Sequence, residues 1–105
     1  MDALFVINAA FPTGQIVASR GVYDLACQNP DFAQFVQKSL NRHVKGNWGD
    51  MDDEDKQTND RALKGYGRLF SAYNDERFPK YGVATIWIIT ESDRSATTIL
   101  FPDEY

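Results

Sequence analysis

The chain has 105 residues, of which 43% are hydrophobic and 25% are charged, and its formal net charge is −4 at pH 7. This length predicts one domain, residues 1–105, and the composition is typical of a globular protein rather than a disordered, repetitive or membrane-spanning one. The acid surplus argues against general phosphate binding, and therefore against direct nucleic-acid binding.

The numbers of cysteine and histidine residues exclude disulfide and zinc chemistry. The single cysteine, Cys27, cannot close an internal disulfide, and with one histidine it cannot complete a zinc site. We therefore expect no metal and no cofactor, and the cytoplasm is the favoured location. The apolar run Ala3–Phe11 lacks a basic leader and is far shorter than the ~20 residues of a transmembrane helix, so we expect neither export nor contact with a membrane.

The first part of the chain predicts one or two strands and a short helix. Leu4–Asn8 and Gln15–Ser19 are short runs of β-branched and aromatic residues, separated by a turn-like sequence. Residues 1–12 are expected to form either an extra strand or an arm packed on the domain. Gly21–Gln28 is a candidate for a short helix.

Two longer helices are predicted in the middle of the chain. Asn29 suits an N-cap and Pro30 the first helical position, apolar residues then recur at helical spacing, and Gly46 suits the end of the helix. A second helix is predicted over Asp52–Lys64. Its narrow apolar stripe predicts a position on the surface.

The last third of the chain predicts a sheet. Arg68–Tyr73, Val83–Thr90 and Ala96–Phe101 are rich in β-branched and aromatic residues, and the middle segment is apolar on both faces, as in a covered central strand. Short connections favour antiparallel neighbours. The predicted fold class is α+β: an antiparallel sheet of three to five strands, including Gln15–Ser19, with two main helices packed on one face.

An acidic cluster precedes the second long helix. It consists of Asp50, Asp52, Asp53, Glu54 and Asp55. An EF-hand loop starting at Asp50 would need glycine and a carboxylate where this sequence has Asp55 and Arg61, so a calcium loop is excluded. Acids in the first turn complement the helix dipole, and the same carboxylates are available to a basic partner. The two interpretations are compatible.

A second candidate site is the turn after the predicted central strand. Glu91, Asp93 and Arg94 could do acid–base work there or hold a phosphate. The same residue types are ordinary turn formers, in which Asp93 bonds its own backbone and Arg94 pairs with one of the acids.

A third candidate site is the end of the first long helix. His43 is expected to satisfy free carbonyls in the last helical turn, and Trp48 is expected to fold back onto the core. A pair between His43 and Asp50 is an alternative, although no motif marks a nucleophile.

Three segments carry a distinctive pattern, His43–Asp50, Gly67–Tyr73 and Ile86–Tyr105, the last reading IWIITESDRSATTILFPDEY. They resemble a group of small bacterial proteins of plasmids and other mobile elements. The chain differs from that group in its longer start, Met1–Pro12, and its expanded connection, Asn74–Gly82. The group offers no catalytic residues to transfer. The resemblance implies a gene carried on mobile DNA, where small acidic proteins often block a host nuclease or its targeting complex.

The leading hypothesis is a non-enzymatic protein–protein interaction module that acts as an acidic inhibitor of a host defence or nucleic-acid-processing complex. It rests on the acidic cluster and on unpaired sheet edges, with carboxylates meeting a basic protein surface in place of phosphates. Formation of a homodimer is a further alternative. One alternative is a small enzyme or ligand-binding domain in which Glu91, Asp93 and Arg94 converge with His43 and Trp48. Another is a nucleic-acid accessory protein that uses Lys56, Arg61, Lys64 and Arg68.

Overall fold

The computed structural model describes residues 9–65, 67–78 and 85–105, and all structural statements below concern these ranges. In chain order, the elements are β1 (Gln15–Ala18), α1 (Arg20–Gln28), α2 (Pro30–Val44), α3 (Asp53–Lys64), β2 (Leu69–Asn74), β3 (Thr85–Thr90), β4 (Ala96–Leu100) and the 3₁₀ turn η2 (Pro102–Glu104). The predicted strand Leu4–Asn8 lies outside the described residues. None of the described helices has the length and apolar character needed to cross a membrane.

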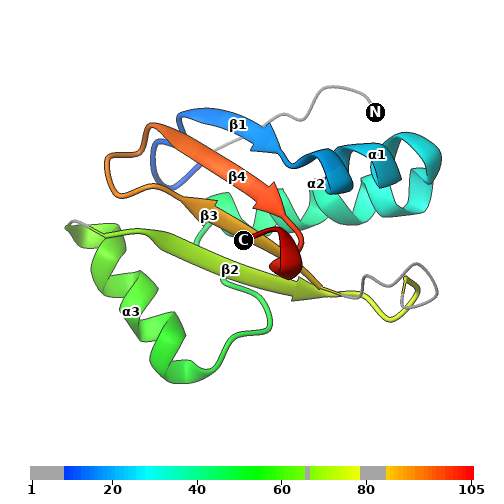
Figure 1. The fold of residues 1–105 in the computed structure, drawn as a ribbon. Coiled ribbons are helices and arrows are strands. Elements are labelled where there is room, and N and C mark those ends of the chain that lie inside the picture. The colour runs from blue at the N-terminus through cyan, green and yellow to red at the C-terminus, as the bar shows by residue number, and fades with distance from the viewer. Residues whose placement is uncertain (1–8, 66, 79–84) are drawn as a thin grey trace.

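The strands form one sheet in the order β1-β4-β3-β2 (Figure 1). β2 and β4 both run antiparallel to β3, with Leu69 opposite Thr90 at one end of the β2–β3 ladder. β1 runs parallel to β4, with Gln15 opposite Ala96. The α+β class is confirmed, but the sheet is mixed rather than purely antiparallel. The chain passes through three helices and two strands between β1 and β4, and such a long connection permits parallel pairing.

α2 and α3 begin directly after residues whose side chains cap them. The Asn29 side chain accepts hydrogen bonds from the backbone N–H groups of Asp31 and Phe32, at 3.0 and 3.2 Å. The Asp52 side chain accepts one from the N–H of Asp55 at 2.8 Å. Because a capping side chain satisfies amides that have no partner inside the helix, both predicted starts are confirmed.

The main core lies between one face of the sheet and the helices α1 and α2. Ile86 and Ile88 of β3 point into this core, where they join Phe32, Val36 and Leu40 of α2. All five are at most 1% exposed. Figure 1 shows α2 running behind the sheet, so this face is covered along its length.

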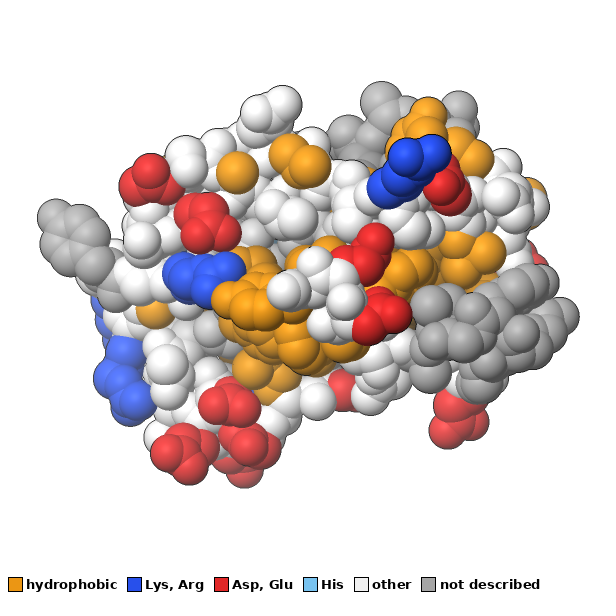
Figure 2. All heavy atoms as spheres, viewed as in Figure 1, with side chains coloured by type: hydrophobic (Ala, Val, Ile, Leu, Met, Phe, Trp, Pro, Cys, Tyr) orange, Lys and Arg blue, Asp and Glu red, His pale blue; other side chains and the backbone are white. Residues whose placement is uncertain are grey.

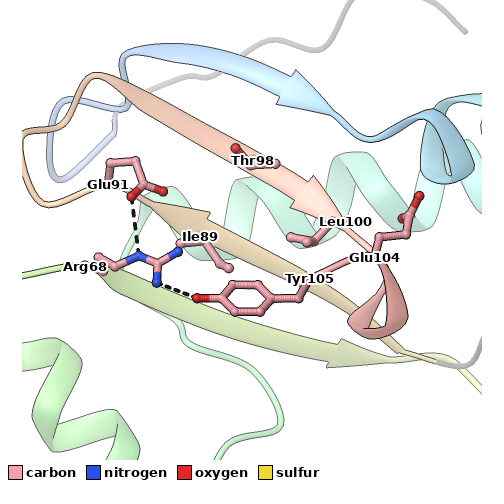
Figure 3. A pocket seen from close by; sticks show the side chains of 7 residues that line it. All are labelled: Arg68, Ile89, Glu91, Thr98, Leu100, Glu104 and Tyr105. Carbon is pink, nitrogen blue, oxygen red and sulfur yellow. Dashed lines mark hydrogen bonds and ion pairs between the residues drawn. The ribbon is translucent and has the colours of Figure 1, made fainter.

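The opposite face of the sheet has no helix over it. Side chains alternate between the two faces of a strand, so Trp87 and Ile89 point away from α2. The 3₁₀ turn η2 lies over this side (Figure 1). Tyr105 lies over it as well (Figure 3). We call this the helix-free face. Ile89 on this face is only 2% exposed and Trp87 is half-buried, so the prediction of a central strand with both faces largely covered is confirmed.

α3 lies beside the sheet rather than on it, along the outer edge of β2. The Asn59 side chain donates to the carbonyl of Phe70 at 2.6 Å and accepts from the N–H of the same residue at 3.0 Å. An amide group thus takes the place of a neighbouring strand.

The loop before α3 covers the rest of this edge. The N–H of Ala72 donates to the carbonyl of Trp48 at 3.4 Å, and its carbonyl accepts from the N–H of Asp50 at 2.7 Å. The Asp50 side chain accepts from the N–H of Asn74 at 2.9 Å. The expectation of unpaired sheet edges is therefore wrong for β2, which is shielded against pairing with another chain.

Candidate functional site

His43 lies in the interior. It is fully buried, with Nδ1 2.6 Å from Ser71 Oγ and Nε2 2.9 Å from Thr90 Oγ1. Thr90 Oγ1 is 2.7 Å from Thr97 Oγ1, and the Thr97 hydroxyl donates to the carbonyl of Thr13 at 2.7 Å. Since each hydroxyl carries one hydrogen, Thr90 donates to Thr97, His43 Nε2 donates to Thr90, and Ser71 donates to Nδ1.

The two expectations for His43 are wrong. Its ring does not satisfy the carbonyls at the end of α2, since the N–H groups of Gly46 and Asn47 bond the carbonyls of His43 and Arg42. It does not pair with Asp50, whose side chain accepts from the N–H of Asn74. His43 is on the face of α2 that packs on the sheet, where the hydroxyls of β2 and β3 are its partners.

Burial determines the charge of His43 and the reactivity of the Ser71 hydroxyl beside it. Burial lowers the pKa of His43 to about 3, so the imidazole is neutral at pH 7. A serine hydroxyl beside a histidine has the geometry of an activated nucleophile. Ser71 and His43 are both 0% exposed, however, so no substrate reaches the hydroxyl in this conformation.

Trp48 is where the sequence predicts it. It is 3% exposed and packs in a second cluster with Phe11, Ala62 and Leu69. Its indole N–H donates to Asp60 Oδ1 of α3 at 2.9 Å. The ring therefore fixes the loop before α3 to the core.

The turn between β3 and β4 is structural. Asp93 Oδ1 accepts from the N–H of Ser95 at 3.0 Å, as predicted, and hydrogen bonding from Ser95 holds the pKa of Asp93 below its usual range. Arg94 has a φ of 61°, which places its side chain across the turn toward the end of α3.

The expected pairing of Arg94 with Glu91 or Asp93 is wrong. Its guanidinium donates to the carbonyls of Gly67 at 2.7 Å, Ala62 at 2.9 Å and Glu91 at 3.1 Å. The Ala62 carbonyl lies in the last turn of α3, where the helix carries partial negative charge that attracts a cation.

The residues of the enzymatic hypothesis do not converge. His43 points to the helix-covered face of β3, and the Arg94 guanidinium is occupied by backbone carbonyls. Glu91 forms an ion pair with Arg68, at 3.4 Å. In the described part of the chain, no group of three or more His, Cys, Asp or Glu is placed to hold a metal ion.

The acidic cluster is presented to solvent at the start of α3. Asp53, Glu54 and Asp55 occupy the first turn, Asp52 is the N-cap, and all are exposed. The ion pairs of the described residues are Arg20–Asp24, Arg68–Glu91 and Arg77–Asp75, and none of them involves an acid of this turn. Figure 2 shows acidic side chains gathered at the lower end of α3.

The helix-free face carries aromatic side chains in contact. The ring centroids of Phe70 and Trp87 are 4.9 Å apart, and those of Trp87 and Tyr105 are 5.8 Å apart. Tyr105 is 67% exposed. In Figure 2, apolar side chains occupy the middle of this face, with acidic and basic side chains around them.

A hollow of about 270 Å³ lies between this sheet face and the residues that cross it (Figure 3). It is lined by Arg68, Ile89, Glu91, Thr98, Leu100, Glu104 and Tyr105. The predicted fold places the helices on one face of the sheet, which leaves this face without them, but no residue pattern predicted the hollow. The aromatic residues Phe70 of β2 and Trp87 of β3, both half-buried, point to this face.

No family model, curated protein or solved structure matches this chain.

Proposed function

We propose that this chain is a non-enzymatic protein-binding module, which docks a basic protein surface onto the helix-free face and the adjoining acidic turn of α3. One observation carries the proposal. A single side of the molecule presents contacting aromatic side chains in its middle and, at its border, the exposed carboxylates of the first turn of α3 (Figure 2).

This combination matches the general anatomy of protein interfaces. Aromatic residues are enriched in the centre of an interface, where water is excluded, and polar residues form its rim. Carboxylates at the rim attract a positively charged partner and orient its approach. The partner that fits is therefore a basic protein surface with an apolar centre.

A surface of this kind suits an acidic inhibitor of a host defence or nucleic-acid-processing complex. Such complexes bind phosphates with basic surfaces, and a row of carboxylates competes for the same cations. The resemblance to proteins of mobile elements supports this context.

The nucleic-acid alternative has less support. The Arg68 guanidinium is occupied by Glu91 and by the hydroxyl of Tyr105, which accepts from Nη1 at 2.7 Å. Lys56, Arg61 and Lys64 share α3 with its acidic first turn, which repels phosphate.

Affinity capture from a bacterial lysate tests the proposal with charge-matched variants. The immobilised wild type is compared with D53N/E54Q/D55N and with the control D24N/D31N/E76Q, which removes the same charge from exposed positions elsewhere. We expect proteins that the wild type and the control retain at low salt, that high salt releases, and that the acidic-turn variant does not retain. An identical set of retained proteins on all three would refute the role of the acidic turn.

A second pair of variants tests the helix-free face. Thr98→Arg places a positive charge at a half-buried position of this face, and Gln34→Arg places the same charge on the exposed side of α2, behind the sheet. Thr98→Arg is expected to lose the proteins that Gln34→Arg retains. Loss of these proteins by Gln34→Arg but not by Thr98→Arg would place the binding surface on the helices.

A further inference from the structure

The residues that cross the helix-free face are attached at two points. At the first, Glu104 Oε1 accepts from Ser19 Oγ at 2.6 Å and from the N–H of Phe101 at 2.8 Å. Glu104 Oε2 accepts from the N–H of Gly21, in the first turn of α1, at 3.1 Å. α1 has no acid of its own in that turn, so Glu104 supplies the negative charge that favours a helix start. Desolvation opposes the charge, but these hydrogen bonds together hold the pKa of Glu104 below its usual range.

The second attachment is Tyr105. Its hydroxyl accepts from Arg68 Nη1 at 2.7 Å, and the guanidinium carbon lies 5.6 Å from the centre of its ring. Arg68 is held in turn by Glu91, and the side chains of this ion pair are 44% and 42% exposed. Water and salt compete with contacts at such exposure, so this attachment is weak.

Between the two attachments, the segment borders an open hollow on the sheet. The hollow of about 270 Å³ separates Glu104 and Tyr105 from the sheet side chains Thr98, Ile89 and Leu100 (Figure 3). Ile89 and Leu100 are nevertheless only 2% and 7% exposed. Tyr105 is the most exposed large hydrophobic residue described, and its ring contacts Trp87 on this face.

We propose that residues 102–105 form a releasable strap over the helix-free face, latched by Glu104 to the start of α1, and that a bound partner displaces this strap. Release exposes Ile89, Leu100 and the full ring of Trp87. The displacement by a partner rests on the function proposed above, whereas release of the strap is a property of the isolated chain.

Gly21 offers a specific way to open the latch. A Cβ at this position would lie 2.7 Å from Glu104 Oε2 and 3.1 Å from Phe101 Cδ2, so Gly21→Ala displaces the end of the flexible Glu104 side chain. Alanine also favours the helix more than glycine does. We therefore expect Gly21→Ala to open the strap without unfolding the domain. Glu104→Ala removes the latch directly, and Asp103→Ala is the control, since Asp103 is an exposed acid of the same turn outside the latch.

Two measurements follow the strap in the isolated chain. With Trp48 replaced by phenylalanine, Trp87 is the only tryptophan, and acrylamide quenching of its fluorescence is expected to be roughly twofold stronger in Gly21→Ala and Glu104→Ala than in Asp103→Ala. In the Trp48-containing protein, the indole N–H signal of Trp87 in a ¹H–¹⁵N spectrum is expected to shift in the same two variants. Far-UV circular dichroism is expected to stay as in the wild type.

Each outcome decides the proposal. Quenching and indole shifts equal to those of Asp103→Ala would show that the strap is not held by the latch. Loss of the circular dichroism signal in both Gly21→Ala and Glu104→Ala would show that these residues belong to the core, and would equally refute a releasable strap. If Trp87 becomes accessible but the lysate proteins are retained as before, the strap opens and only its competition with a partner is refuted.

Discussion

At the scale of single residues, His43 shows how burial decides a role. Its two ring nitrogens contact hydroxyls from β2 and β3, and the edges of the Phe11 and Trp48 rings approach it at 5.5 and 5.6 Å between centroids. No charged side chain is among its contacts in the described part of the chain. The imidazole therefore stays neutral and links the helix to the sheet.

This environment predicts a pH dependence of stability. The pKa of His43 is about 3 in the folded chain and 6.5 ordinarily, so the unfolded chain binds a proton that the folded chain does not. The contribution of His43 to stability is thus constant above pH 6.5 and is lost as the pH falls from there toward 3, by about 1.4 kcal/mol per pH unit.

Urea unfolding between pH 6.5 and about 5, above the main range of carboxylate titration, measures this slope. His43→Asn is expected to be less stable at every pH but nearly flat over this interval. An equal slope in the wild type and in His43→Asn would show that other groups cause the pH dependence.

Local roles were predictable from the sequence, and long-range partners were not. Asn29, Asp52 and Asp93 bond backbone groups within three residues, so their neighbours alone identify their roles. His43 and Arg94 find their partners between 27 and 47 residues away, apart from the turn carbonyls beside Arg94. Such partners depend on the folded topology, which the local sequence does not contain.

At the scale of elements, the outer edge of β2 depends on α3. The Asn59 side chain is 3% exposed and satisfies both backbone groups of Phe70. Asn59→Ala is expected to cost about 2 kcal/mol of stability, because these groups lose their partner where water has little access. Gln57→Ala, at an exposed position of the same helix, is expected to change stability by less than about 0.5 kcal/mol.

Denaturant unfolding compares the two variants, and hydrogen exchange of the Phe70 amide locates the effect. Faster exchange at Phe70 in Asn59→Ala alone is the expected result. Equal stability of the two variants would contradict the role assigned to Asn59.

Gly49 is the second residue that protects the outer edge of β2. Its φ is 79°, and a Cβ there would lie 2.2 Å from the carbonyl oxygen of Ala72. Gly49→Ala is therefore expected to destabilise the fold by roughly 2 kcal/mol or more, through backbone strain and the lost bridge to β2. Gly65→Ala is the matched control, since the nearest atom to its Cβ would be 3.9 Å away. Thermal melting of the two variants tests this, and a Gly49→Ala melt equal to that of Gly65→Ala would refute it.

Helix bounds followed from the sequence more faithfully than sheet topology. The predicted segments Asp52–Lys64 and Gly21–Gln28 agree closely with α3 and α1, because caps and spacing are local signals. The parallel pairing of β1 with β4 joins residues 81 positions apart, such as Gln15 and Ala96, and no local signal marks it. Alternation shows that both sides of β3 are apolar, but it does not show that η2 and Tyr105 lie over the second side.

At the scale of the whole molecule, one side of the sheet is packed against helices and the other side is a surface. One side forms the core with α1 and α2, and the other presents aromatic rings beneath a short strap. The acidic turn of α3 stands at the border of that second side (Figure 2). Hydrophobic contact and charge attraction are thereby available to one partner at the same time.

Hydroxyl-radical footprinting of the chain in complex with its captured partner tests the proposed binding face most directly. Trp87 and Phe70 lie on the helix-free face, and Tyr23, 49% exposed on α1, is an internal reference. We predict that the partner lowers the oxidation of Trp87 and Phe70 and leaves that of Tyr23 unchanged. Protection of Tyr23, with Trp87 and Phe70 oxidised as in the free chain, would contradict the proposed binding face.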